Sequence, residues 1–190
     1  MPLLPAPIDR DDLARRYIAT EVQVEGESYR SYRDVLDEAG RRLLASFAVD
    51  APSPLPASLP AWRPFAEVPA ALAELRRRGR KIAILSNVDR DLIASSISQL
   101  GLEPDLVVTA QDCGSYKPAP GHWRVFRERS GADVGGTIHV GASQLHDVRP
   151  AAALGWRTVF VDRHGEPLET APTRVIGDLA PLPDVIDALE

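Results

Sequence analysis

The feature that most constrains the fold is an alternation of helical patterns with short apolar runs after Pro64. The helical patterns lie at 67–78, 89–100, 120–130 and 148–154, and the apolar runs lie at 81–85, 106–108, 138–140 and 158–161. Strands that alternate with helices are typical of a parallel sheet covered by helices on both faces. The sequence therefore predicts an α/β fold for this part of the chain.

The N-terminal region has a different pattern. Residues 9–48 predict two helices separated near Gly26. The second helix carries an apolar stripe of Tyr29, Tyr32, Leu36, Ala39, Leu43 and Phe47. A helical pair this small needs a larger domain on which to pack, so we expect a small helical cap. Five prolines follow at 51–64, and they predict a linker without regular structure. The predicted division is a cap and linker at 1–60 and an α/β core at 61–190.

Composition limits the partners and the compartment. The net charge is −5, and the one dense cationic run, at 76–81, falls at a helix end where cations offset the helix dipole. We therefore expect no nucleic-acid partner. No apolar run approaches the roughly 20 residues needed to span a bilayer, and the N-terminus lacks a signal-peptide pattern. Cys113 is the single cysteine, which excludes an internal disulfide. These features predict a cytoplasmic protein without a membrane partner.

Polar side chains follow three of the predicted strands. Ser86 and Asn87 follow the first, Lys117 follows the second across a loop, and Asp147 follows the third. Ligands of open parallel sheets bind beyond the carboxyl ends of the strands. Hydroxyl, amide and ammonium groups suit an anionic substrate or transition state. Each residue alone has another interpretation. Ser86 and Asn87, or Asp147, could cap the next helix, and Lys117 could lie in an ordinary loop. The prediction rests on their order and spacing.

Three segments in this order resemble the second, third and fourth motifs of the haloacid dehalogenase superfamily. They are Ile84-Leu85-Ser86-Asn87, Tyr116-Lys117-Pro118-Ala119-Pro120 and residues 139–147. The continuation at 150–163 resembles the branch that holds the type II 2-haloacid dehalogenases, and the resemblance covers about residues 9–190. It implies a Rossmann-like core with a helical cap inserted after the first strand. It also implies hydrolysis through an ester formed by a nucleophilic aspartate.

The resemblance implies roles for the residues that follow the strands. Ser86 and Asn87 would bind the carboxylate or phosphate of the substrate. Lys117 would hold the nucleophile and stabilise negative charge. Asp147 would orient Lys117 or water, or hold a metal if one is bound.

Further substrate contacts are implied elsewhere in the chain. Ser143 lies within the fourth motif, and Trp123 falls where this branch tends to place a tyrosine. The branch also needs an arginine from the cap, for which Arg15 and Arg16 are candidates.

The first departure from the family pattern concerns the nucleophile. The superfamily places it at the end of an apolar strand before the cap, in a pattern such as Asp-x-Asp-Gly-Thr. Asp9 and Asp11 have the acid spacing, but they predict the start of a helix instead. Without that first, central strand, the strands that end at Ser86 and Gly141 would each have an unpaired edge. Residues 1–7, with three prolines, are a poor substitute. We expect the biological protein to extend upstream of Met1, and the alternative is a truncated, inactive form.

The second departure is Ala142, where metal-dependent phosphatases of the superfamily usually carry an acid. Mg²⁺ prefers carboxylate ligands, and only Asp147 would remain. We therefore expect no cofactor and disfavour Mg²⁺. The leading hypothesis is a hydrolase of the dehalogenase type that acts on a small anionic substrate such as a 2-haloacid. The alternatives are a phosphatase for small phosphomonoesters and a non-catalytic anion-binding or regulatory protein. The resemblance also allows a homodimer.

Overall fold

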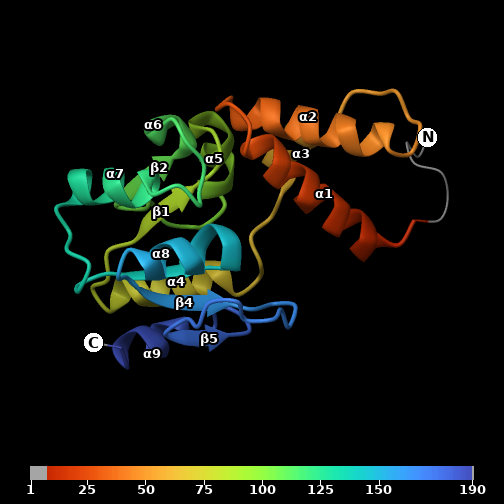
Figure 1. Ribbon diagram of the computed structural model, residues 1–190. Helices are drawn as coiled ribbons and strands as arrows, with labels where there is room; N and C mark the ends of the chain where they lie inside the picture. The colour runs from red at the N-terminus through yellow and green to blue at the C-terminus, as the bar shows by residue number, and fades with distance from the viewer. Residues whose placement is uncertain (1–7, 190) are drawn as a thin grey trace.

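Strands and helices alternate through most of the computed structural model, which describes residues 8–189 (Figure 1). The predictions for residues 1–7 therefore lie outside the described part of the chain. The strands are β1 (Ala83–Ser86), β2 (Leu106–Thr109), β3 (Ile138–Gly141), β4 (Arg157–Val161) and β5 (Arg174–Ile176). The main helices of the α/β region are α4 (Val68–Arg77), α5 (Arg90–Ile97), α7 (Gly121–Ser130) and α9 (Leu182–Asp187). Shorter helices are α6 (Ala110–Cys113), the π-helix η2 (Gln144–Val148) and α8 (Arg149–Ala153). The predicted α/β fold is confirmed.

All the strand pairs among residues 8–189 are parallel, and they form two sheets there. β1 pairs with β2, so that Ser86 lies opposite Thr109, and β3, β4 and β5 form the second sheet in that order. Within residues 8–189, β1 and β3 each pair along one side only. Every residue of these two strands is half-buried, whereas four of the five residues of β4 are buried. The strands that end at Ser86 and Gly141 therefore have the unpaired edges that the sequence predicted.

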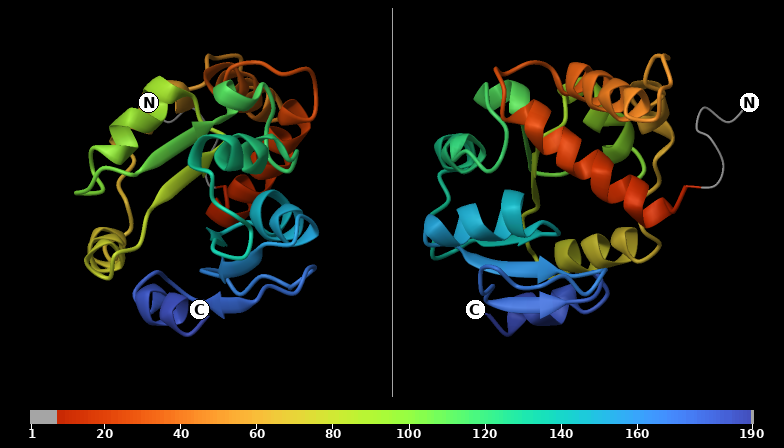
Figure 2. Two further views of the ribbon diagram at one scale, coloured as in Figure 1. Left: turned by 90° about the vertical axis from the view of Figure 1, so that its left-hand side faces the viewer. Right: turned by 45° about the vertical axis from the view of Figure 1, so that its right-hand side comes forward.

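Helices lie against the sheets (Figure 2), and they pack on them through separate apolar clusters. Val108 of β2 packs in one cluster with Trp123 and Phe126 of α7. Val159 of β4 packs in another, together with Leu75 of α4 and residues of α9. These clusters hold the two sheets in place and leave the carboxyl ends of the strands at the edge where polar residues were predicted.

The predicted helical pair is α1 (Arg10–Glu25) and α2 (Tyr32–Ala45). Asp9 caps α1 by accepting a hydrogen bond from Asp12 N at 2.9 Å, as expected for a helix start rather than a nucleophile motif. The buried face of α2 shares Leu36 and Ala39 with the predicted stripe but is otherwise different, because the helix packs against α1, against the segment after it and against the core. Its buried residues are Val35, Leu36, Ala39, Gly40 and Leu44.

A buried carboxylate joins α2 to the α/β region. Asp89 is 2% exposed, and its two oxygens accept hydrogen bonds from Tyr32 N and Arg33 N, both at 2.9 Å. This contact satisfies backbone donors at the start of α2 and places a negative charge at the positive end of that helix. Nearby, the Tyr116 hydroxyl donates to the Arg30 carbonyl at 2.8 Å. The helical pair is thus fixed above the end of β1.

The proline-rich segment contains regular structure, so the prediction of an unstructured linker was wrong. It forms α3 (Leu55–Ser58) and the 3₁₀ turn η1 (Leu59–Ala61). Proline fits the first turn of a helix because the backbone donor it lacks has no partner there. Both elements carry proline in that position. Leu59 is 3% exposed and packs with Leu36 and Leu92, and this burial supplies a reason for the turn to form.

The cationic run at 76–81 is partly neutralised within the chain. Arg76 binds Asp105 at 2.6 Å, and Arg78 binds Asp187 at 2.6 Å, which links the end of α4 to α9. No helix within residues 8–189 is both apolar and long enough to cross a bilayer.

Candidate functional site

Lys117 lies between the ends of two strands. Its Nζ donates to Asp147 Oδ1 at 2.6 Å and to the Leu85 carbonyl at 3.0 Å. The side chains of Lys117 and Asp147 are only 10% and 12% exposed. Leu85 belongs to β1, and Asp147 follows β3, so the ammonium group connects the two strands that have unpaired edges. Two of the predicted site residues are therefore in direct contact.

Asp147 is held as a charged group by several donors. Besides Lys117, His139 Nε2 lies 3.4 Å from its Oδ1, and Ser143 N donates to its Oδ2 at 3.2 Å. Burial alone would raise the pKa of Asp147, but the hydrogen bond from His139 and the charge of Lys117 outweigh it. The pKa of this carboxyl is thus well below its usual range. A Cβ on Gly141 would lie 2.3 Å from the Asp147 Cβ, so only glycine allows this approach.

Asn87 holds the backbone of Lys117 from both sides. Its Oδ1 accepts from Lys117 N at 2.7 Å, and its Nδ2 donates to the Lys117 carbonyl at 3.2 Å. Neither Asn87 nor Ser86 caps the following helix, because Asp89 occupies the N-cap position of α5. The helix-cap interpretation of these two residues was therefore wrong, and Asn87 instead fixes the loop that carries the lysine.

Ser86 connects to the site through its backbone. Its carbonyl lies 3.0 Å from His122 Nε2, and its Oγ accepts from Val88 N at 3.3 Å. Burial lowers the pKa of His122 to about 4, so this ring is neutral at pH 7 and donates to the carbonyl through Nε2.

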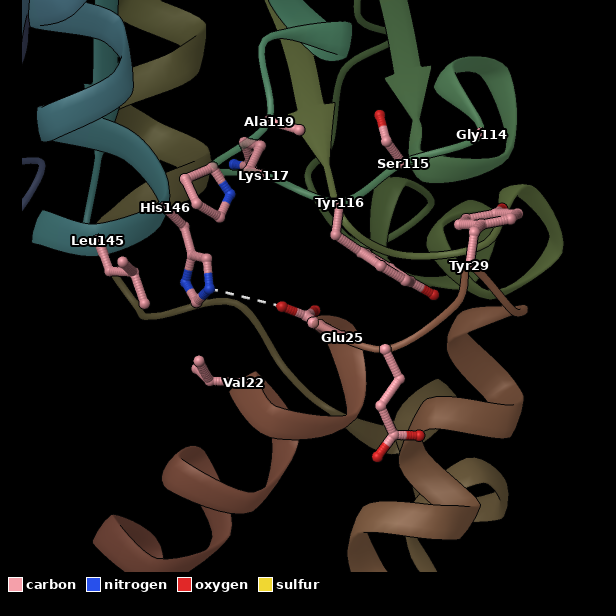
Figure 3. A pocket seen from close by; sticks show the side chains of 13 residues that line it. Val22, Glu25, Tyr29, Gly114, Ser115, Tyr116, Lys117, Ala119, Leu145 and His146 are labelled. Atoms are coloured by element: carbon pink, nitrogen blue, oxygen red, sulfur yellow. Dashed lines mark ion pairs between the residues drawn. The ribbon is translucent and has the colours of Figure 1, made fainter.

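A cavity of about 500 Å³ opens beside Lys117, between the end of α1 and the loops of the α/β region (Figure 3). Its walls are partly apolar and aromatic, and Tyr29 and Tyr116 contribute rings whose centroids are 5.5 Å apart. A space of this size can take a small organic molecule. The other lining residues are Val22, Glu25, Gly26, Glu27, Gly114, Ser115, Pro118, Ala119, Leu145 and His146.

The sequence analysis missed two polar residues of this cavity. Glu25, the last residue of α1, lies with its Oε2 3.4 Å from His146 Nε2, and Figure 3 shows the carboxylate pointing toward that ring. Its Oε1 accepts from Asn87 Nδ2 at 3.3 Å. The signal that could have identified Glu25 is its place at the C-terminal end of a helix, where a carboxylate is electrostatically unfavourable.

Of the predicted site residues, Lys117 alone is among the residues that line the cavity. Ser143 positions Asp147 through its backbone and accepts from His146 N at 3.1 Å through its Oγ. Trp123 is 1% exposed, packs in the core, and has its ring centroid 5.2 Å from that of His139. Arg15 and Arg16 are exposed and bind Asp12 on the same helix. The substrate contacts predicted for Ser143 and Trp123 stay predictions.

Asp147 is also the candidate metal ligand. Both of its oxygens already accept hydrogen bonds or contact a cation, and Ala142 offers no ligand. Within residues 8–189, no group of three or more His, Cys, Asp or Glu side chains could hold a metal ion. The described residues therefore do not fit a Mg²⁺ site by themselves. The expectation that no cofactor is needed stays a prediction.

These features define a class of protein: parallel α/β, with a buried Lys–Asp pair at the carboxyl ends of its strands and a helical pair above it. A family model described as haloacid dehalogenase-like hydrolase matches residues 6–155. The chain therefore belongs to the haloacid dehalogenase-like hydrolase family.

Individual relatives include a dehalogenase and a phosphatase. The chain is 33% identical over 108 residues to the (S)-2-haloacid dehalogenase of Pseudomonas sp. (strain YL), covering 56% of this chain and 46% of the relative. It is 35% identical over 119 residues to the phosphoserine phosphatase of Thermus thermophilus, covering 60% and 48%. The chain spans about half the length of the curated relatives it matches.

A solved structure has the same fold. It is an L-2-haloacid dehalogenase from Xanthobacter autotrophicus with chloropropionic acid covalently bound. The TM-score is 0.83 at 19% identity, over 95% of this chain and 87% of the other. At this identity the similarity establishes the fold alone.

Proposed function

We propose that this chain forms the substrate-binding part of a hydrolase that removes halide from small 2-haloacids. The observation that carries the proposal is the position of Lys117. Its ammonium group is buried, bonded to Asp147, and borders a cavity large enough for a small acid. A fixed cation in a partly dry site stabilises negative charge far better than a hydrated one.

The reaction requires a carboxylate nucleophile near Lys117. In the proposed first step this carboxylate attacks the carbon that carries the halogen, a carbon–oxygen bond forms, and halide leaves with the electron pair of the broken bond. Water then hydrolyses the ester, which yields the hydroxy acid and a proton and regenerates the carboxylate. The unpaired edges of β1 and β3 flank Lys117, and we propose that a strand with the nucleophilic aspartate fits between them.

The roles of the described residues follow from their contacts. Lys117 would hold the nucleophile and offset the charge that develops as halide departs. Asp147 and Asn87 would position Lys117, one through its ammonium group and the other through its backbone. Asn87 also has an amide hydrogen directed at the cavity residue Glu25, and this donor would bind the substrate carboxylate. Ser86 would share that role.

A phosphatase is the second candidate, and the match to a phosphoserine phosphatase favours it. The same Lys117 and Asn87 groups would bind a phosphate. The donor set around Asp147 argues against it, because the metal-dependent mechanism needs a second carboxylate and residue 142 is alanine.

Product release assays separate these functions. The chain as given, and the chain extended by any codons in frame upstream of Met1, should be incubated with 2-chloropropionate and with phosphoserine. We expect halide release from the chain that carries the strand with the nucleophilic aspartate, and we expect Lys117→Met in that chain to abolish it. Phosphate release alone would favour the phosphatase. Anion binding without either product would favour the non-catalytic alternative and overturn the proposal.

A further inference from the structure

Glu25 occupies an unusual position for a carboxylate. It is the last residue of α1, no basic residue lies in the last turn of that helix, and its side chain is 7% exposed. A negative charge at the C-terminal end of a helix is disfavoured by the helix dipole, and burial adds a desolvation cost. The contacts of 3.3 Å to Asn87 and 3.4 Å to His146 are long for charge-assisted bonds. The stability of the helix therefore does not explain why Glu25 lies here.

The hydrogen bonds of Asn87 show which position Glu25 occupies. An asparagine side chain has two amide hydrogens. One donates to the Lys117 carbonyl and the other to Glu25 Oε1, while Asn87 Oδ1 accepts from Lys117 N. The hydrogen directed at Glu25 is thus the one donor of Asn87 that a substrate could use. The Glu25 side chain is a carboxylate, the same kind of group as the substrate carboxylate that this Asn87 donor is proposed to bind.

We propose that Glu25 is a specificity-determining residue that holds the anion position until a substrate anion displaces it. The inference rests on the proposed function in one respect, the assignment of Asn87 as an anion donor. An incoming carboxylate must replace Glu25 as the acceptor of the Asn87 hydrogen bond. It must also lie near the negative charge of the displaced Glu25. Small anions that make no other contact should therefore bind weakly, and substrates with further contacts in the cavity should be selected.

Glu27 offers a matched control in the same cavity. It lies two residues away and lines the same cavity, but its carboxylate binds Arg30 and Arg42, each at 2.7 Å. Removing its charge changes the total charge of the protein by the same amount and leaves the Asn87 donor occupied. Any difference between the two variants therefore reports on the position of Glu25.

The test uses propionate, a carboxylate without a leaving group, so that no turnover is needed. Binding should be measured by calorimetry and by the shift of the Asn87 side-chain amide in ¹⁵N NMR spectra. We expect Glu25→Gln to bind propionate about tenfold more tightly than the wild type, equivalent to about 1.4 kcal/mol. Glu25→Ala should behave similarly, and Glu27→Gln should remain within about twofold of the wild type.

The outcomes of this test differ from those of the activity assay. Equal or weaker propionate binding by both Glu25 variants, with circular dichroism showing that they are folded, would overturn the inference. So would equal gains in Glu25→Gln and Glu27→Gln, because the effect would then be one of total charge. Tighter propionate binding, together with no halide release from a chain that carries the nucleophilic aspartate, would support the role of Glu25 and contradict the dehalogenase proposal.

Discussion

Two pairs of ionisable side chains lie at or beside the cavity, and they are built differently. The Lys117–Asp147 pair lies within the α/β region, has a 2.6 Å contact, and receives further hydrogen bonds on its carboxylate. The Glu25–His146 pair joins the helical pair to the α/β region through a 3.4 Å contact. The first pair is preorganised, and removing one of its partners should lower the free energy of unfolding strongly. The second pair can separate with little loss of free energy. In our proposals, the chemistry belongs to the first pair, the fixed pair, and the selection of the substrate belongs to the second, the adjustable pair.

The sharpest test of the fixed pair is Lys117→Met. It leaves Asp147 buried without its cation, and removing one partner of a buried pair typically costs about 3–5 kcal/mol. The free energy of unfolding, measured by urea denaturation, should fall by that amount. Lys81 is the only other lysine and is exposed, so Lys81→Met is the matched control and should change stability little. Equal losses in the two variants would show that the buried pair is not special.

Gly141→Ala tests the close packing behind that pair. The added methyl group would lie 2.3 Å from the Asp147 Cβ, and such overpacking costs about 1–3 kcal/mol. At Gly136 the nearest side-chain atom to an added methyl is 3.5 Å away, so Gly136→Ala should be nearly neutral. A fully stable Gly141→Ala variant would mean that the Asp147 side chain can move and is not preorganised.

The pH dependence of stability tests the charge on Asp147. Its pKa is lowered in the folded protein, so its contribution is fully present above the unfolded value of about 4 and is lost as pH falls toward the folded pKa. The unfolding free energy of the wild type should therefore fall as the pH drops below about 4. Asp147→Asn has no such group. Its loss of unfolding free energy between neutral and acid pH should therefore be smaller than that of the wild type, by on the order of 2 kcal/mol. Equal losses of unfolding free energy at acid pH in the wild type and in Asp147→Asn would contradict the proposed charge of Asp147.

The sequence predicted the fixed pair but not the adjustable one, for a physical reason. Lys117 and Asp147 each follow a strand, and parallel strands bring their carboxyl ends to one edge, so order along the chain predicts proximity. Glu25 meets Asn87 across 62 positions, and Asp89 meets Tyr32 across 57. These contacts depend on how the helical pair docks on the α/β region, which no local pattern encodes.

Short elements were missed for a related reason. The strand β5 has three residues, and α3 has four, too few for a periodic pattern to be visible. Tertiary burial, such as that of Leu59 against Leu36, favours structure in a segment where the prolines alone suggested a plain linker. The α/β order, the helical pair and, among residues 8–189, the one-sided pairing of β1 and β3 were predictable because each rests on several residues.

The smallest effect is expected for the adjustable pair. Glu25→Gln loses a long contact to His146, but it also removes a charge that opposes the dipole of α1, and each term is typically below about 1 kcal/mol. The two terms offset, so the free energy of unfolding should change by less than about 0.5 kcal/mol in either direction. Glu27→Gln loses two shorter contacts to arginines and should be the less stable variant of the two. A large loss in Glu25→Gln would mean that Glu25 is a structural anchor of the helical pair, because a group that yields its place to a substrate cannot also be essential for holding α1 in position.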